Sequence, residues 1–176
     1  NNMFGMVKFF KKAEAAGIKP IAGTTLNLKS PSGELGEILC LAKNNDGLKQ
    51  LMGIISNSQL QQENGQISVS FNDVSSCAGN IIVISGGSSS TIFNLVKHHK
   101  IQDLKTELLS FKETFENDFI IEIQRLGKIF EEEFIQCILP LASEFLIPVI
   151  ASNDTMFSQK EDFDIHETKV CINTGK

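Results

Sequence analysis

The chain has 176 residues, of which 41% are hydrophobic and 21% are charged. Its 16 Lys and Arg residues against 21 Asp and Glu residues give a formal net charge of −5. This composition excludes disordered, collagen-like and coiled-coil chains, and the length suits one core in one domain or a piece of one. The acidic balance argues against a free-standing nucleic-acid binder, which normally carries a basic surface.

Membrane and secretory signals are not expected in this sequence. The longest apolar candidate, residues 134–150, is interrupted by polar residues and two prolines, and is too broken to span a bilayer. The chain opens without the pattern of a signal peptide. Four cysteines stand singly, with no CxxC pair, which argues against a zinc ribbon. We therefore expect a cytoplasmic protein with no membrane partner.

In the first third of the chain, the apolar spacing alternates between helix-like and strand-like. It predicts a helix over residues 3–14 that ends at Gly17, a strand over 18–28, a turn at 31–33 and a strand over 37–42. Asn45-Asp46 is expected to cap the helix that follows. The polar segment 58–79 is predicted to be a surface excursion.

The rest of the chain repeats the alternation of strand and helix. β-branched runs predict strands, and longer amphipathic segments predict helices. Strands are expected at 80–85, 118–123 and 147–152, and helices at 91–98, 103–115, 129–145 and 161–172. This order predicts an α/β protein with a mostly parallel sheet, either open or barrel-like.

Catalytic and binding residues in such folds lie at the carboxyl ends of the strands. The positions to inspect are therefore Thr24-Thr25, Lys43-Asn44-Asn45, Gly86-Gly87-Ser88, Gln124-Arg125 and Asn153-Asp154.

The glycine-rich run from Gly86 to Ser90 lies between a predicted strand and a predicted helix. Gly86, Gly87 and Ser88 could present backbone N–H groups to an anion at the helix start. The Walker spacing and its lysine are absent, so nucleotide binding is not predicted. A strand-to-helix turn with a Ser or Thr cap is the favoured interpretation.

Two further groups are candidates for a metal or proton-transfer site. Asn153-Asp154 follows a buried strand and could bind a metal or act as a base, or equally could cap a turn. His166 lies among acidic residues on the last predicted helix, and a surface or packing role is favoured over a ligand role. A complete Ser/His/Asp, HExxH or Cys/His set cannot be assembled from this sequence.

Seven residue strings carry more information than the periodicity. In chain order they are NMFG (2–5), VKF (7–9), AGIKPIAG (16–23), LAKNNDG (41–47), ISGG (84–87), ASNDTMF (151–157) and DFDIHE (162–167). In this order they resemble the PHP (polymerase and histidinol phosphatase) domain of bacterial DNA polymerase III alpha subunits. The resemblance covers nearly the whole chain.

The resemblance implies a PHP-type distorted seven-stranded (β/α) barrel, here incomplete because the first strands would lie before Asn1. Residues 1–176 would be most of one PHP domain. The palm and fingers of the parent DNA-directed DNA polymerase, a nucleotidyltransferase that uses Mg²⁺, would lie beyond Lys176. The polymerase site is therefore not expected in these residues, and whether the chain is itself an enzyme stays open.

The resemblance also identifies vestigial metal-site positions. Metal-binding members have a carboxylate at Thr25, a His near Glu37, a Cys at Gly87, and an Asp-x-His pair at Asp154 and Met156. Here only Asp154 is retained, although Glu37 could in principle bind a metal. One retained carboxylate does not make a zinc or manganese site, which needs several converging ligands. The sequence therefore predicts a hydrolytically inert domain with no cofactor.

Two functions follow as hypotheses. The first is a non-catalytic scaffold within the polymerase alpha subunit, active in DNA replication, which docks the proofreading exonuclease subunit while other domains contact most of the DNA. The alternative is a phosphoesterase or 3′–5′ exonuclease that depends on Zn or Mn and uses Asp154 as a retained ligand. A third, weaker hypothesis is a phosphate-binding module at Gly86–Ser90.

Overall fold

The computed structural model describes residues 3–60 and 67–175 of the chain. In this part of the chain, six strands form one sheet in the order β3-β1-β2-β4-β5-β6. The strands are β1 (Gly23–Lys29), β2 (Leu35–Ala42), β3 (Val69–Ser70), β4 (Ile81–Ile84), β5 (Phe119–Ile123) and β6 (Val149–Ala151). The helices are α1 (Met6–Ala15), α2 (Asn45–Leu60), α3 (Phe71–Ser75), α4 (Thr91–Lys97), α5 (Ile101–Phe115), α6 (Glu131–Glu144) and α7 (Phe163–Thr174).

The sheet is mixed, whereas the sequence favours a mostly parallel one. β2 runs antiparallel to both β1 and β4, while the pairs β1–β3, β4–β5 and β5–β6 are parallel. The cause is the tight turn between β1 and β2, in which Ser30 N–H donates to the Glu34 carbonyl and Gly33 has a φ of +83°. So short a connection can join only antiparallel strands. The sheet is not closed, which fits an incomplete PHP-type barrel.

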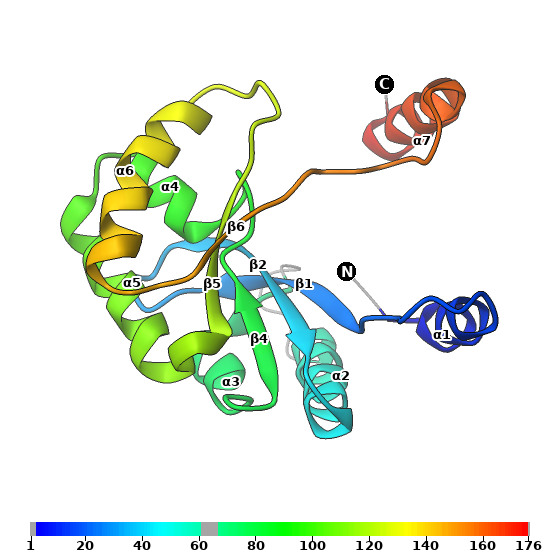
Figure 1. Cartoon of the computed structure of the whole chain (residues 1–176), viewed down its shortest axis with the longest axis horizontal. Coiled ribbons are helices and arrows are strands. Elements are labelled where there is room, and N and C mark those ends of the chain that lie inside the picture. Colours follow the sequence, from blue (N-terminus) through cyan, green and yellow to red (C-terminus); the bar gives the residue numbers. More distant parts are fainter. Residues whose placement is uncertain (1–2, 61–66, 176) are drawn as a thin grey trace.

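Helices cover one face of the sheet. Side chains alternate along each strand, and in β1 and β2 the buried positions are every second residue, at Leu26, Leu28, Ile38 and Cys40. Figure 1 shows α4, α5 and α6 on this side of the sheet, while α1 and α7 extend away at the opposite side. The core therefore lies between the sheet and these helices.

Aromatic rings fill the centre of this core. The Phe111 ring of α5 stacks on Phe119 of β5, with ring centroids 4.8 Å apart, and meets Phe71 of α3 edge-on at 5.0 Å. Phe111 and Phe119 are almost fully buried. Such pairs add to the free energy gained by burying apolar area, so they hold α3 and α5 against the sheet.

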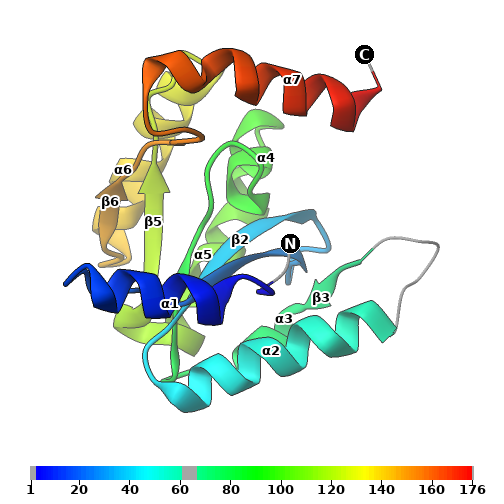
Figure 2. The same ribbon diagram turned by 90° about the vertical axis from the view of Figure 1, so that its right-hand side faces the viewer.

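The other face of the sheet is only partly covered. Leu39, Leu41 and Ile82 share this face in neighbouring strands, and all three are half-buried. Figure 2, which views the molecule from the right-hand side of Figure 1, shows this face between α1 and α7. Within residues 3–60 and 67–175, every helix is too short or too polar to cross a bilayer.

Three local expectations differ from the structure. β1 begins at Gly23 rather than at residue 18, because Ile18 and Ile21 are exposed on either side of Lys19-Pro20. The cap of α2 is Asn44 rather than Asn45-Asp46, since Gly47 N–H donates to Asn44 Oδ1 at 2.8 Å.

The third difference concerns the expected surface excursion at 58–79. Residues 61–66 of that segment lie outside the described residues. Part of the rest belongs to the core, because Val69 in β3, Val74 in α3 and Cys77 are all buried. The parallel pairing of β3 with β1 places Val69 beside Leu28 in the core.

A buried carboxylate joins three separate segments of the fold. Glu107 on α5 is 0% exposed. Its Oε2 accepts hydrogen bonds from the hydroxyls of Ser30 at 2.7 Å and Ser32 at 2.6 Å, and its Oε1 accepts one from Thr91 at the start of α4. A charge can be buried where several hydrogen bonds replace its hydration. Glu107 therefore fixes the β1–β2 turn against α4 and α5.

We expect Glu107→Ala to lower the free energy of unfolding by about 2–4 kcal/mol, because it leaves buried hydroxyl groups without an acceptor. Urea unfolding followed by circular dichroism measures the change, a suitable probe because the chain has no Trp or Tyr. Glu113→Ala is the matched control, since Glu113 is an exposed residue of the same helix. Equal losses for both variants would contradict this role of Glu107.

Candidate functional site at the carboxyl edge of the sheet

Three loops meet at one edge of the sheet because β4, β5 and β6 are parallel. The loop after β4 contains Gly87, the loop after β5 contains Gln124, and the residue after β6 is Ser152. Gln124 Nε2 donates to Ser152 Oγ at 3.1 Å, and a Cβ added to Gly87 would lie 2.4 Å from Gln124 Oε1. Of the strand-end candidates, Gly87 and Gln124 are brought together here, whereas Asn153 and Asp154 are exposed in the segment beyond β6.

Glu37 also lies at this edge, although its strand, β2, runs in the opposite direction to β4. β2 is antiparallel to β4, so the start of β2 lies beside the end of β4. Glu37 N–H donates to the Ser89 carbonyl at 2.9 Å, and the Glu37 carbonyl lies 2.8 Å from a Cβ built on Gly86. Two vestigial positions, Glu37 and Gly87, are therefore brought to the same loop.

The same topology sends the end of β2 to the other edge of the sheet. Lys43 N–H donates to the Asn80 carbonyl, just before β4, and the Lys43 ammonium pairs with Asp118, just before β5, at 2.6 Å. Lys43-Asn44-Asn45 is thus remote from the loops after β4 and β5. Its inclusion among the strand-end candidates was wrong, because it assumed that β2 was parallel to β4.

Hydrogen bonds at the loop after β4 support its interpretation as a capped turn. Ser90 is the N-cap of α4: its Oγ accepts from Phe93 N–H at 3.0 Å, and its own N–H donates to the Gly87 carbonyl at 3.1 Å. Gly86 has a φ of +75°, a conformation that side chains disfavour. α4 has only seven residues, so its dipole offers little to an anion at Gly86, Gly87 and Ser88.

A buried carboxylate organises the edge from β5. Glu122 is 8% exposed, and its Oε1 accepts hydrogen bonds from Ser152 Oγ and from Gln124 Nε2 at 3.3 Å. Ser85 Oγ accepts from the Glu122 N–H at 3.0 Å. Glu122 thereby links the ends of β4, β5 and β6. Its position inside the apolar run of β5 was the signal that could have identified it.

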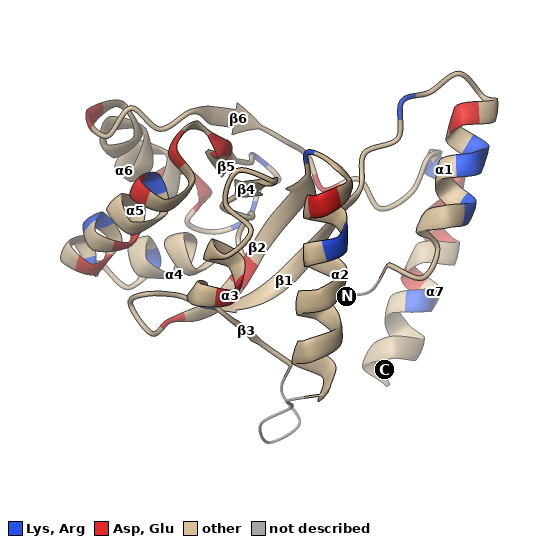
Figure 3. Cartoon of the chain, turned by 90° about the horizontal axis from the view of Figure 1, so that it is seen from below, with Lys and Arg blue, Asp and Glu red and all other residues tan. Residues whose placement is uncertain are grey.

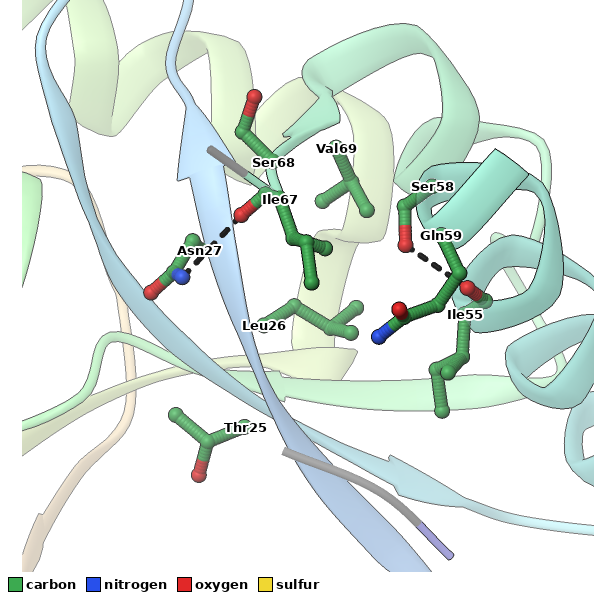
Figure 4. A pocket seen from close by; sticks show the side chains of 9 residues that line it. All are labelled: Thr25, Leu26, Asn27, Ile55, Ser58, Gln59, Ile67, Ser68 and Val69. Carbon is green, nitrogen blue, oxygen red and sulfur yellow. Dashed lines mark hydrogen bonds between the residues drawn. The ribbon is translucent and has the colours of Figure 1, made fainter. Parts of the chain in front are cut away.

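Thr25 lies in the middle of β1 rather than at a strand end, opposite Leu39 of β2. It forms part of the lining of a pocket of about 80 Å³ between β1, the end of α2 and residues 67–69. Figure 4 shows Thr25 on the other side of β1 from Leu26 and Ile55, and shows Asn27 Nδ2 donating to the Ile67 carbonyl at 3.2 Å. A Thr at this position supplies no carboxylate to the edge.

Asp154, Met156 and His166 lie beyond β6. Asp154 and Met156 are exposed in the segment that leads to α7. The His166 ring on α7 packs against Phe157, with ring centroids 5.5 Å apart. This contact fits the favoured packing role of His166.

The cysteines are poorly suited to bind a metal. Burial, with a smaller contribution from nearby Cys77, raises the pKa of the Cys40 thiol to about 12. Burial also raises the pKa of Cys77 and of Cys137. Such thiols stay protonated at neutral pH, whereas metals bind the thiolate. Among the described residues there is no group of three or more His, Cys, Asp or Glu that could hold a metal ion.

Charge is mixed over most of the surface. Figure 3 shows Lys and Arg interspersed with Asp and Glu on α5, whereas the charged residues of α6 are all acidic. α1 differs, because it carries Lys8, Lys11 and Lys12 against one acidic residue, Glu14. The concentrated basic charge on α1 is therefore small in extent compared with the footprint of a nucleic-acid-binding surface.

Comparisons with known proteins agree with the fold and with the resemblance of the sequence to the PHP domain. The chain matches the PHP domain family over residues 1–126, and it belongs to that family.

Relatives extend this match over the rest of the chain. The chain is 34% identical to the DNA polymerase III subunit alpha of Pseudomonas aeruginosa over 179 aligned positions, which cover 100% of the chain and 15% of that protein. It is 29% identical to the subunit alpha of Haemophilus influenzae and 32% identical to that of Borreliella burgdorferi, over 99% of the chain in each case. The chain thus spans about one sixth of the length of these relatives.

The two glycines of the loop after β4 are expected to respond differently to the same substitution. Gly86→Ala places a Cβ against the Glu37 backbone at a positive φ, so we expect a loss of about 1–3 kcal/mol in unfolding free energy. Gly87→Ala meets only the flexible end of Gln124, so its loss should stay below about 1 kcal/mol. Urea unfolding compares the two, and a larger loss for Gly87→Ala would contradict this geometry.

Proposed function

We propose that this chain is a non-catalytic PHP domain of a DNA polymerase III alpha subunit, and that it serves DNA replication as a scaffold. The observation that carries the proposal is the state of the five vestigial positions. Gly87 has no side chain, Thr25 and Met156 supply no strong ligand, and Asp154 is exposed beyond β6. Of the two retained carboxylate residues, only Glu37 belongs to a strand that contacts the loop after β4, through its backbone N–H.

This residue set does not fit a zinc or manganese centre. Such centres need several nitrogen, oxygen or sulfur ligands that converge on one point. Here two carboxylates remain, one at the start of β2 and one in the segment after β6. We derive no hydrolytic step through these residues.

The relatives support a role inside a larger polymerase chain. All of those named above are called DNA polymerase III subunit alpha, and the chain aligns along its whole length with about one sixth of each. In this proposal the remainder of the alpha subunit is the immediate partner. It holds the Mg²⁺-dependent nucleotidyltransferase site and makes most of the contacts to DNA.

Docking of the proofreading exonuclease subunit is the second part of the proposal, and it rests on the resemblance to polymerase PHP domains. The structure adds surfaces that suit a protein partner. α7 exposes Ile165, Val170 and Ile172, and α1 exposes Val7 and Phe9. Apolar residues exposed on neighbouring helix turns are typical of protein contact surfaces.

The alternative is a metal-dependent phosphoesterase or 3′–5′ exonuclease. One observation favours it: the retained carboxylate of Asp154 is exposed, and Glu37 is only half-buried, so both are accessible to a metal ion. Zn or Mn would then be bound by these two residues together with ligands from outside residues 1–176.

Elemental analysis of the full-length polymerase chain separates these two functions. We expect zinc and manganese well below one ion per chain, and no change in either metal in Asp154→Ala. Asp164→Ala is the control, because Asp164 is an exposed carboxylate on α7. Stoichiometric zinc or manganese that only Asp154→Ala removes would contradict the inert scaffold.

The docking role is tested by binding of the purified exonuclease subunit to the full-length chain and to a chain that lacks residues 1–176. We expect the deletion to abolish binding. DNA synthesis by the truncated chain serves as the control that the remainder is folded. An active truncated polymerase that binds the exonuclease as well as the full-length chain would remove docking from the proposal.

A further inference from the structure

A small pocket lies between the loop after β4 and the loop after β5. Its polar walls come from Ser88, Glu122, Gln124 and Glu131, and Phe93 and Phe134 form its apolar wall. The cavity volume is about 10 Å³. This is room for one water molecule or one ion, and it excludes an organic ligand.

Glu131 is the unusual member of this lining. It is the first residue of α6 and is 5% exposed. Its Oε2 accepts hydrogen bonds from the backbone N–H groups of Leu126 at 2.8 Å and Lys128 at 3.0 Å. Its Oε1 is buried and, among the described residues, has no hydrogen-bond partner. Burying a carboxylate oxygen without a hydrogen-bond partner costs free energy, so this oxygen indicates a bound water or ion.

A second carboxylate lines the same pocket. Glu122 is 8% exposed, and the hydrogen bonds from Ser152 and Gln124 both fall on its Oε1. The Phe93 and Phe134 rings, with centroids 5.1 Å apart, exclude water from the opposite wall. Two carboxylates that line one small pocket beside an apolar wall favour a cation in that pocket.

Within the described residues, the cationic side chains near the pocket pair with groups other than Glu122 and Glu131. Lys128 is exposed, and its ammonium donates to Ser88 Oγ at 3.1 Å rather than to Glu131. Arg125 pairs with Glu132 at 2.8 Å on the surface. The positive end of the α6 dipole is offset by the three successive glutamates of its first turn, residues 131–133.

We propose that this pocket binds one divalent cation of the Mg²⁺ class, with Glu131 Oε1 as its central ligand and an oxygen of Glu122 beside it. Every side-chain ligand is an oxygen, which suits Mg²⁺ or Mn²⁺ rather than Zn²⁺. Mg²⁺ is commonly held by one or two carboxylates, and waters complete its coordination. The bound ion would tie β5 to the start of α6.

The proposed ligands differ from the vestigial positions of the family. Glu122 and Glu131 are not among those positions, and Gly87, the one vestigial position that lines the pocket, has no side chain. The inference therefore revises the expectation of a metal-free chain only for a structural ion, and it leaves the non-catalytic function unchanged.

Electron paramagnetic resonance of free Mn²⁺ tests the site in the full-length chain, with Mn²⁺ as the probe. The polymerase site also binds Mn²⁺, so the quantity compared is the number of ions that a variant loses. We expect Glu131→Gln to lose one ion, or to weaken its binding at least about tenfold. The Gln side chain can still accept the Leu126 and Lys128 hydrogen bonds, so the loop should keep its fold.

Two controls make the result specific. Glu132→Gln removes the same charge from an exposed neighbour, and Asp154→Ala removes the family carboxylate, so both should keep the ion. Mg²⁺ should compete with the Mn²⁺ lost in Glu131→Gln. The site is refuted if Glu131→Gln binds as much Mn²⁺ as the unchanged chain, or if Glu132→Gln loses the same amount. An ion lost in Asp154→Ala alone would instead revive the hydrolytic alternative.

Discussion

The direction of β2 is the constraint on which the arrangement of the edge depends. Because β2 runs against both neighbours, its first residues lie beside the loop after β4, and its last residues lie beside the starts of β4 and β5. The contact is close enough that two glycines are required. A Cβ on Gly36 would lie 2.4 Å from the Thr91 nitrogen, and one on Gly86 would lie 2.8 Å from the Glu37 carbonyl. Backbone atoms cannot move aside as a flexible side chain can, so this edge is fixed by main-chain packing.

The sequence predicts the elements better than their directions. The apolar runs of β4 and β5 and the amphipathic pattern of α5 identify these elements, because burial on both faces or on one stripe leaves a clear period. The alternation of strand and helix favours parallel pairing. The prediction followed this alternation and gave too little weight to the short turn at Pro31-Ser32-Gly33, which makes β1 and β2 antiparallel. The resemblance to the PHP domain identifies the family, which the family match over residues 1–126 and the relatives along the whole chain confirm.

The polar part of the candidate site was harder to predict for a physical reason. Glu122 interrupts an apolar run, whereas Glu107 and Glu131 stand in segments with other acidic residues. In none of the three cases does the local sequence reveal the hydrogen-bond partners. Those partners come from other segments: three hydroxyls for Glu107, Ser152 and Gln124 for Glu122, and two backbone N–H groups for Glu131. A residue-by-residue pattern cannot show contacts that span 75 or 77 residues of sequence, as at Glu107.

These buried carboxylates also explain how the edge can persist without the ligands of a hydrolytic centre. Most of its hydrogen bonds join loops to strands through Ser85, Glu122, Gln124 and Ser152, and none of these is a vestigial metal position. The side chains at those positions make none of these hydrogen bonds, so a substitution there leaves the network untouched. Selection for a contact surface would therefore preserve the fold of the domain while its metal ligands changed, whereas selection for hydrolysis would have to preserve both.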